Sequence, residues 1–139
     1  MHPLCNSVTV LFLLHREPQR RHRETQRKKA YMKLKDLCSY LDSEVPLSFQ
    51  ESYDNSGLQV GKADTEINSA LITLDVTEEV IDEAIKNNCN LVVSHNPLIF
   101  GGIKKISDSS LVGRIIYKCI DHGIAVYSAH TNLDIFQNS

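Results

Sequence analysis

The sharpest change from hydrophobic to polar residues lies in the segment 91–97. Residues 91–93 are apolar without a break, and a serine, His95, an asparagine and Pro97 follow them. A short unbroken apolar run is typical of a strand buried on both faces of a parallel sheet. Pro97 has no backbone N–H and favours extended geometry in the residue before it, so the strand must end near His95. We therefore expect His95 at the carboxyl end of a strand, the edge where open α/β sheets bind ligands.

The segments on either side alternate between strand and helix patterns. Residues 70–74 are apolar enough for a strand, and Thr77 followed by two glutamates is typical of a helix start. Residues 111–120 carry apolar side chains at helical spacing, Gly123 is well placed to end that helix, and residues 124–128 have strand character. The β-α-β-α-β order predicts an α/β fold with a mostly parallel sheet, right-handed crossovers and flanking helices.

Side chains that can bind metals follow each of the three predicted strands. They are Asp75, His95, and His130 together with Asp134. Because parallel strands bring their carboxyl ends to one edge of a sheet, we expect these four residues to share that edge. Two imidazoles and two carboxylates on a common edge are typical of a metal site.

The part of the chain before these strands begins in an orderly way at Met32. Apolar side chains recur at intervals of three and four from residue 34 to residue 41, which predicts one face of an amphipathic helix. Pro46 closes that segment, and the residues 54–57, Asp-Asn-Ser-Gly, are a strong turn signal. Residues 58–60 then form a short strand candidate.

Composition and charge narrow the class of protein. With 139 residues and 42% hydrophobic composition, the chain can bury one core. Its net charge of -2 is unevenly distributed along the chain, since residues 32–139 hold eight basic and fifteen acidic residues. Residues 32–139 are thus acidic as a group, whereas a nucleic-acid phosphate backbone binds clusters of lysine and arginine. This charge disfavours direct nucleic-acid binding. The four cysteines are far apart and form no Cys-x-x-Cys pair, which favours a reducing, intracellular setting.

Residues 1–31 are expected to be an extra or disordered leader, with Met32 as the natural start. The apolar run 8–14 is too short to span a bilayer, where about 20 residues are needed, so we expect no membrane span. Positive charge follows this run, whereas a secretory signal carries it in front. The arginines leave a mitochondrial location open, but two glutamates and few serines count against it. We therefore expect a cytoplasmic protein.

Three separated motifs resemble one family. Residues 53–61, 91–100 and 128–134 are similar, in order and spacing, to segments of the NIF-three-like family, also called YbgI-like or GTP cyclohydrolase I type 2-like. The resemblance runs from Met32 to about Asp134, which corresponds to the family's N-terminal lobe. It implies an α/β fold with two similar lobes, a homo-oligomer that is a ring-shaped hexamer, and a centre of two divalent metal ions such as zinc, iron or manganese.

The resemblance also implies roles for individual residues. His95 matches the first histidine of the family's His-His-Pro motif, and Asp134 matches the carboxylate that bridges the two metals. His130 matches a histidine in or beside the site, and we take it as the catalytic candidate that positions water or substrate. The turn at 54–57 matches a segment that shapes the rim of the site.

Two departures from the family pattern limit what can be carried over. Asn96 stands where the family has its second histidine, and a neutral amide oxygen is a weak ligand for zinc-like ions. The family continues into a second half with a His-x-x-x-Glu metal motif that nothing in this sequence replaces. We therefore expect a truncated member, with residues 32–139 as its N-terminal lobe and at most a partial metal site.

Each of these residues also has a plainer interpretation. A lone histidine at a strand end is usually a hydrogen-bonded structural residue, and packing explains His130 as well as a direct role does. Asn96 fits a turn residue before proline, and Asp75 fits a strand-end residue. The loop 99–105 either closes over the site, makes a subunit contact or is a mobile surface loop.

Two classes of function follow from the sequence. The first is a metal-dependent hydrolase, in which His95 and Asp134 bind metal and His130 positions water or substrate. The second is a non-catalytic scaffold that binds metal or protein partners, which Asn96 and the missing second half favour. A partial gene product without a selected function is a third interpretation.

Overall fold

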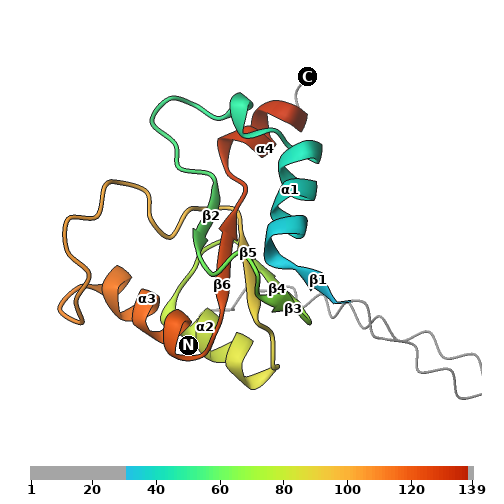
Figure 1. Ribbon diagram of the computed structural model, residues 1–139. Helices are drawn as coiled ribbons and strands as arrows, with labels where there is room; N and C mark the ends of the chain where they lie inside the picture. The colour runs from blue at the N-terminus through green and yellow to red at the C-terminus, as the bar shows by residue number, and fades with distance from the viewer. Residues whose placement is uncertain (1–30, 138–139) are drawn as a thin grey trace, which may run out of the picture.

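The computed structural model describes residues 31–137, which form a four-stranded sheet with helices on both faces (Figure 1). The strands are β1 (Met32–Lys33), β2 (Gly57–Val60), β3 (Glu66–Ile67), β4 (Ala70–Thr73), β5 (Leu91–Ser94) and β6 (Ala125–Ser128). The helices are α1 (Leu34–Glu44), the 3-10 helix η1 (Leu47–Phe49), α2 (Glu78–Lys86), α3 (Leu111–Asp121) and α4 (Thr131–Gln137).

The main sheet has the order β2-β6-β5-β4. The three strands β4, β5 and β6 are parallel, with Leu71 beside Val92 and Val92 beside Val126, while β2 runs antiparallel along β6. The strands β1 and β3 form a separate antiparallel pair. The predicted β-α-β-α-β fold with a mostly parallel sheet and flanking helices is thus confirmed.

The ends of the helices follow local sequence signals. The Thr77 hydroxyl accepts a hydrogen bond from the Val80 N–H (3.2 Å) at the start of α2. Gly123 ends α3 with a φ of +64°, a conformation that costs glycine little. Ile124, predicted as strand, instead donates its N–H to the Cys119 carbonyl at the helix end (2.8 Å), so β6 begins one residue later.

Helix α1 begins differently, because no side chain caps it. The N–H groups of Leu34 and Lys35 donate to the carbonyls of Thr65 (2.8 Å) and Ala63 (2.9 Å), which belong to the segment between β2 and β3. A distant loop therefore satisfies two donors that the first turn of a helix leaves open.

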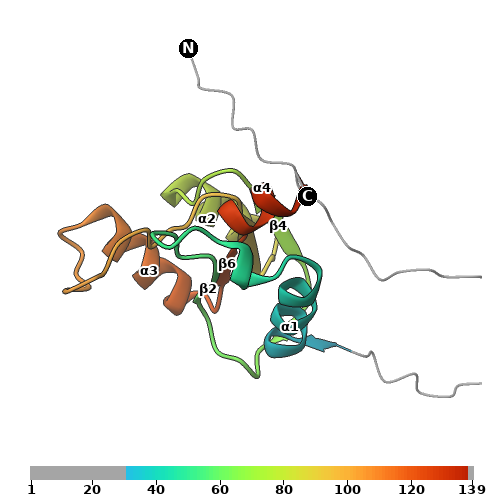
Figure 2. The same ribbon diagram turned by 90° about the horizontal axis from the view of Figure 1, so that it is seen from above.

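The hydrophobic core has two parts, one on each face of the main sheet. Seen from above, α1 lies on one side and α2 with α3 on the other (Figure 2). Successive side chains of a strand point to opposite faces of the sheet, so each strand contributes to both parts of the core. Val92 and Val126 face α2 and α3, while Leu91 and Tyr127 face α1. The strand β5 is thus buried from both sides, as its unbroken apolar run predicts.

Tyr127 carries the main polar group of the α1 side. Its hydroxyl donates to a carboxylate oxygen of Asp42 (2.6 Å), while the residue as a whole is only 2% exposed. Burial, together with the Asp42 charge, raises the pKa of Tyr127 far above its ordinary value. Tyr127 therefore remains a neutral donor that ties α1 to the central strand.

Three cysteines lie within the described residues. Cys38, Cys89 and Cys119 are free thiols, and burial raises the pKa of Cys119 to about 11. Within residues 31–137, every helix is too short or too polar to cross a bilayer. Cys5 and the expected leader lie outside the described residues, apart from Tyr31.

Candidate metal-binding and catalytic site

His95 follows β5 directly, and a backbone carbonyl holds its ring. The Nδ1 atom lies 2.9 Å from the carbonyl oxygen of Ala129. Because a carbonyl oxygen can only accept, Nδ1 carries the proton, and in the neutral ring Nε2 keeps its lone pair. A carbonyl on the other ring nitrogen is the support that metal-binding histidines commonly have. His95 therefore lies where the sequence predicts, with its Nε2 atom turned toward Asp134.

His130 lies between β6 and α4, and a carboxylate holds its ring. Its Nδ1 atom is 3.0 Å from Oδ1 of Asp54. The same reasoning assigns the proton to Nδ1 and leaves the lone pair on Nε2. The rings of His95 and His130 have centroids 5.2 Å apart and stand edge to face. The structure thus brings together two imidazoles, each supported from behind by a hydrogen-bond acceptor.

Asp54 is the buried support of His130. Its side chain has no exposed surface, and it accepts hydrogen bonds from the Asn55 N–H (2.7 Å), the Ser56 hydroxyl (3.1 Å) and both the N–H and the hydroxyl of Thr131. Burial by itself raises the pKa of Asp54. The hydrogen bonds from Thr131 and His130 outweigh burial and hold this pKa well below its ordinary value. Asp54 is therefore a fixed negative charge behind the imidazole.

No sequence pattern points to this role of Asp54. The Asp-Asn-Ser-Gly pattern explains the turn, and the resemblance suggests a place at the rim of the site. The structure instead buries the Asp54 side chain behind His130, its partner 76 residues later. The sequence shows only an aspartate in a turn, and it does not show that this side chain is buried.

Asp134 reaches the site from the first turns of α4. The N–H groups of Leu133 and Asp134 both donate to the His130 carbonyl, so the chain turns helically from His130 onward. Residues four apart then lie on one side of the helix. The Oδ2 atom of Asp134 is 3.6 Å from Nε2 of His95, and its side chain is 54% exposed. Three of the predicted site residues, His95, His130 and Asp134, are therefore neighbours.

Asp75 and Asn96 form a separate pair at the same edge of the sheet. The Asn96 side-chain N–H donates to Oδ1 of Asp75 (2.7 Å), and its backbone N–H donates to the Leu74 carbonyl (2.9 Å). The Ser94 hydroxyl in turn donates to the Asn96 carbonyl (2.9 Å). The structure thus places Asp75 at the predicted edge but bonds it to Asn96, a strand-end role that agrees with the plainer interpretation.

The side chains at this edge include the donor types that bind divalent metal ions. Imidazole nitrogens and carboxylate oxygens are the ligands that zinc, iron and manganese accept. In the part of the chain that the structure describes, no group of three or more histidine, cysteine, aspartate or glutamate side chains could hold a metal ion. The side chains of His95, His130 and Asp134 therefore suit such an ion by their chemistry, but within the described residues they do not form a complete site.

The loop after β5 is fastened beside His130 by two amide side chains. Asn55 donates its side-chain N–H to the Ile99 carbonyl (2.7 Å), and the Gln59 side-chain oxygen accepts from the Ile99 N–H (3.1 Å). Gln59 also donates to the Asn55 carbonyl (2.7 Å). The next residue, Phe100, lies with its ring edge to face with His130, at a centroid distance of 6.1 Å. These contacts place the start of the loop beside the site, while residues 101–106 are exposed, so all three interpretations of the loop stay predictions.

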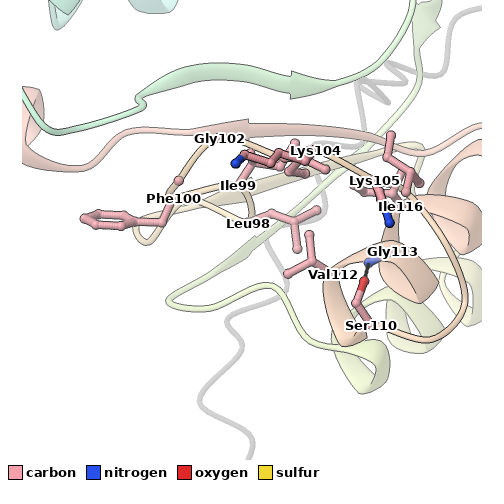
Figure 3. A pocket seen from close by; sticks show the side chains of 13 residues that line it. Leu98, Ile99, Phe100, Gly102, Lys104, Lys105, Ser110, Val112, Gly113 and Ile116 are labelled. Carbon is pink, nitrogen blue, oxygen red and sulfur yellow. Dashed lines mark hydrogen bonds between the residues drawn. The ribbon is translucent and has the colours of Figure 1, made fainter.

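A cavity of about 450 Å³ opens on the other side of this loop (Figure 3). Residues 98–106 and the start of α3, including Ser110, Val112 and Gly113, line it. Phe100 reaches its margin, but the ring points away from the other labelled side chains (Figure 3). Neither histidine of the site lines this cavity, so it is distinct from the candidate site.

Comparison with known proteins identifies related sequences. The family model for Duf34/NIF3 (NGG1p interacting factor 3) matches residues 32–139. A "GTP cyclohydrolase 1 type 2 homolog" of Clostridium acetobutylicum is 45% identical over 103 residues, 74% of this chain and 38% of that protein. One of Bacillus subtilis is 47% identical over 90 residues, 65% of this chain and 24% of that protein. The chain thus spans well under half the length of these relatives.

Solved structures agree with this grouping. A Bacillus cereus protein related to NIF3 superimposes with a TM-score of 0.70 at 41% identity, over 76% of this chain and 29% of that one. Reduced HcgD from Methanocaldococcus jannaschii superimposes with a TM-score of 0.69 at 32% identity, over 76% of this chain and 42% of that one. Most of the described fold therefore recurs inside longer proteins.

Proposed function

The chain belongs to the Duf34/NIF3 family, and from this membership we propose that it supplies part of a divalent metal centre for a hydrolytic reaction. His95 and Asp134 are the proposed metal ligands. His130, held by Asp54, is the proposed catalytic residue. The names of the relatives that match, homologues of GTP cyclohydrolase 1 type 2, make hydrolytic ring opening one member of the proposed reaction class.

The observation that carries this proposal is the approach of two acceptor atoms. The Ala129 carbonyl fixes the proton of His95 on Nδ1, so the Nε2 lone pair points toward a carboxylate oxygen of Asp134 at 3.6 Å. Two lone pairs that face each other repel unless a proton on Nε2 or a metal cation lies between them. The separation exceeds the 2.7–3.2 Å of an ordinary N–H···O hydrogen bond. A shared metal cation satisfies both atoms, which supports ligand roles for His95 and Asp134.

Each residue of the site would have a separate role in the proposed hydrolysis. A divalent ion held by His95 and Asp134 would supply Lewis-acid polarisation of the substrate and would lower the pKa of a water toward ~7. His130 presents the Nε2 lone pair and can accept a proton from the attacking water. Asp54 holds the imidazole in that tautomer and stabilises the positive charge that proton transfer creates. Transfer of the proton onward to the leaving group would complete the reaction.

Metal content tests the proposal directly. The purified chain is dialysed against zinc, iron or manganese, and bound metal is measured by elemental analysis. We expect His95→Ala and Asp134→Ala to lose bound metal. His122→Ala is the matched control, because this histidine is exposed at the end of α3 and should leave metal content unchanged. Equal metal content in all four proteins would refute the ligand assignment.

Turnover tests the hydrolytic step separately. Metal-stimulated hydrolysis of p-nitrophenyl phosphate should fall about 10²-fold or more in His130→Ala while metal binding persists. Loss of metal and activity together in this variant would instead make His130 a ligand. Unchanged turnover would remove it from the reaction.

A non-catalytic scaffold is the second candidate, and the bond between Asn96 and Asp75 favours it. Asn96 stands at the position of a family metal ligand, yet its side-chain N–H is engaged with Asp75 (2.7 Å). Asn96→His separates the two candidates. Added metal and turnover in this variant favour a decayed enzyme, whereas added metal without turnover favours a scaffold.

Assembly is a further part of the proposal. We propose that the chain forms a homo-oligomer, with protein partners as the alternative use of the same surfaces. Mass in solution, measured with and without metal, tests it, and a monomer under both conditions would contradict it. A cytoplasmic location is part of the same proposal, and fractionation of the source cells checks it.

A further inference from the structure

We propose that the cavity between the loop 98–106 and helix α3 binds an aliphatic carboxylate, such as a medium-chain fatty acid. The proposal goes beyond the hydrolytic function above and does not rest on it, because neither His95 nor His130 lines this cavity. The expected occupant is a small molecule with an apolar body and one anionic group.

The size and the floor of the cavity suit a small apolar molecule. Its volume is about 450 Å³, within the roughly 300–1,000 Å³ of typical ligand pockets. Leu98 and Ile116 line it, are 8% and 4% exposed, and belong to the hydrophobic core on the α2 and α3 face of the sheet. Val112 packs against the same core. The core therefore holds this floor in place, and an apolar ligand need not order it first.

The apolar lining favours an aliphatic ligand over an aromatic one. Ile103 and Ile106 line the cavity from the loop and are 38% and 51% exposed, so a ligand would remove their apolar surface from water. Phe100 supplies the one aromatic ring among the described lining residues, and that ring points away from the other labelled side chains (Figure 3). A planar ring would therefore lack a stacking partner here, whereas a flexible aliphatic chain can follow the branched side chains.

The charge of the lining selects an anion. Among the described residues that line the cavity, Lys104 and Lys105 alone are charged. Neither forms an ion pair within residues 31–137, whereas Lys35 and Lys118 are each paired with an aspartate. Two ammonium groups are thus available to a ligand. A lysine can cover apolar surface with its methylene groups while its ammonium meets a carboxylate in water, so one ligand can use both properties of this lining.

The start of α3 also lines the cavity, but its donor there is already engaged. The Gly113 N–H donates to the Ser110 hydroxyl (3.0 Å), a bond that Figure 3 shows at this end of the cavity. The Arg114 N–H donates to the Ser110 carbonyl (3.0 Å). Recognition of the anionic group therefore falls to Lys104 and Lys105, and their replacement is the decisive change.

Isothermal titration calorimetry of the full chain with octanoate, 1-octanol and acetate tests the proposal. We expect octanoate to bind, 1-octanol to bind at least about fivefold more weakly because it lacks the charge, and acetate not to bind because it lacks the apolar body. Lys104→Gln/Lys105→Gln should weaken octanoate binding at least about fivefold and leave 1-octanol binding unchanged. Lys33→Gln/Lys35→Gln is the matched control, because it removes the same charge from the surface on the α1 side and should bind octanoate as wild type does.

Two further variants test the apolar part of the cavity. Val112→Phe adds bulk to the lining and should weaken binding of both octanoate and 1-octanol at least about fivefold, while circular dichroism checks that α3 stays folded. Ile103→Ser changes an exposed loop position, so its effect does not depend on the fold of the core. It should weaken binding of both ligands about threefold.

Zinc content of the same proteins separates this proposal from the metal site. His95→Ala should lose zinc and bind octanoate unchanged, whereas Lys104→Gln/Lys105→Gln should keep zinc. Unchanged octanoate binding in the lysine variant would overturn the proposal. Loss of octanoate binding in His95→Ala would also overturn it, because the ligand would then lie at the metal edge. Binding of the chain to phosphatidylglycerol vesicles without binding of octanoate would do the same, because the loop would then be a membrane contact.

Discussion

The Nδ1 atom of His130 lies 3.0 Å from Oδ1 of Asp54, a carboxylate whose side chain has no exposed surface. The same carboxylate accepts hydrogen bonds from the N–H and the hydroxyl of Thr131, the first residue of α4. Asp54 therefore fixes both the proton of the imidazole and the start of the helix that carries Asp134. The support of the catalytic candidate and the position of a proposed metal ligand depend on one side chain.

Asp54→Asn should destabilise the fold. The amide keeps the size of the side chain but offers one acceptor oxygen, so several donors around it lose their partner. We expect a loss of about 2–4 kcal/mol in the free energy of unfolding, measured by urea titration. Asp64→Asn is the control, because its side chain is 74% exposed and its ion pairs with Lys33 and Lys35 lie at the surface. That change should leave the free energy of unfolding nearly unchanged, and equal losses in both variants would contradict the role of Asp54.

The stabilisation by Asp54 should depend on pH in a defined direction. Hydrogen bonds hold the pKa of Asp54 in the folded protein below its ordinary value of 3.8. The unfolded chain therefore takes up the proton first, and the contribution to stability is full above 3.8 and is lost as the pH falls through the folded pKa. The difference in unfolding free energy between wild type and Asp54→Asn should be constant from about pH 7 to pH 5 and shrink below pH 4. A difference that grows in acid would contradict this assignment.

Two isoleucines of α3 offer a comparison of buried and exposed positions on one helix. Ile115 is 1% exposed in the core under the sheet, while Ile120 is 61% exposed. Ile115→Ala should cost about 2–5 kcal/mol, because it leaves a cavity among packed side chains. Ile120→Ala should change stability by less than about 0.5 kcal/mol. Chemical denaturation of both variants checks this, and similar losses would mean that α3 packs through a different face.

Gly113→Ala should destabilise α3, although alanine usually favours a helix. An added Cβ would lie 1.9 Å from the Ser107 carbonyl oxygen and 2.8 Å from the Ser110 hydroxyl. The backbone before α3 would have to move, at a cost of more than about 1 kcal/mol, instead of the usual gain of about 0.5–1 kcal/mol. Gly102→Ala is the control, since no atom lies within 4 Å of its added Cβ. Thermal unfolding measures both, and a higher melting temperature for Gly113→Ala would contradict this close contact.

Local patterns were sufficient for the parallel part of the sheet, β4 to β6, and for the helices α1, α2 and α3. The unbroken run 91–93 placed β5 in the centre of the sheet, and Thr77 and Gly123 marked helix ends that the structure has. These signals work because a capping hydroxyl, a positive φ and the spacing of apolar side chains act within a few residues. The position of His95 at the carboxyl end of β5 follows from the same local chemistry, while its metal-binding role stays a prediction.

The sequence by itself therefore determined the order of the strands and helices from β4 to β6 and the edge at which the candidate residues gather. The short strands β1 and β3 and the helix α4 appear only in the structure. Only the tertiary structure decided that Asp54 stands behind His130, that Asn55 and Gln59 hold Ile99, and that Asp75 bonds Asn96 instead of a histidine. Each of these contacts joins residues at least 21 positions apart. Their geometry depends on how the sheet edge and the surrounding loops pack, and no local spacing of residues encodes that.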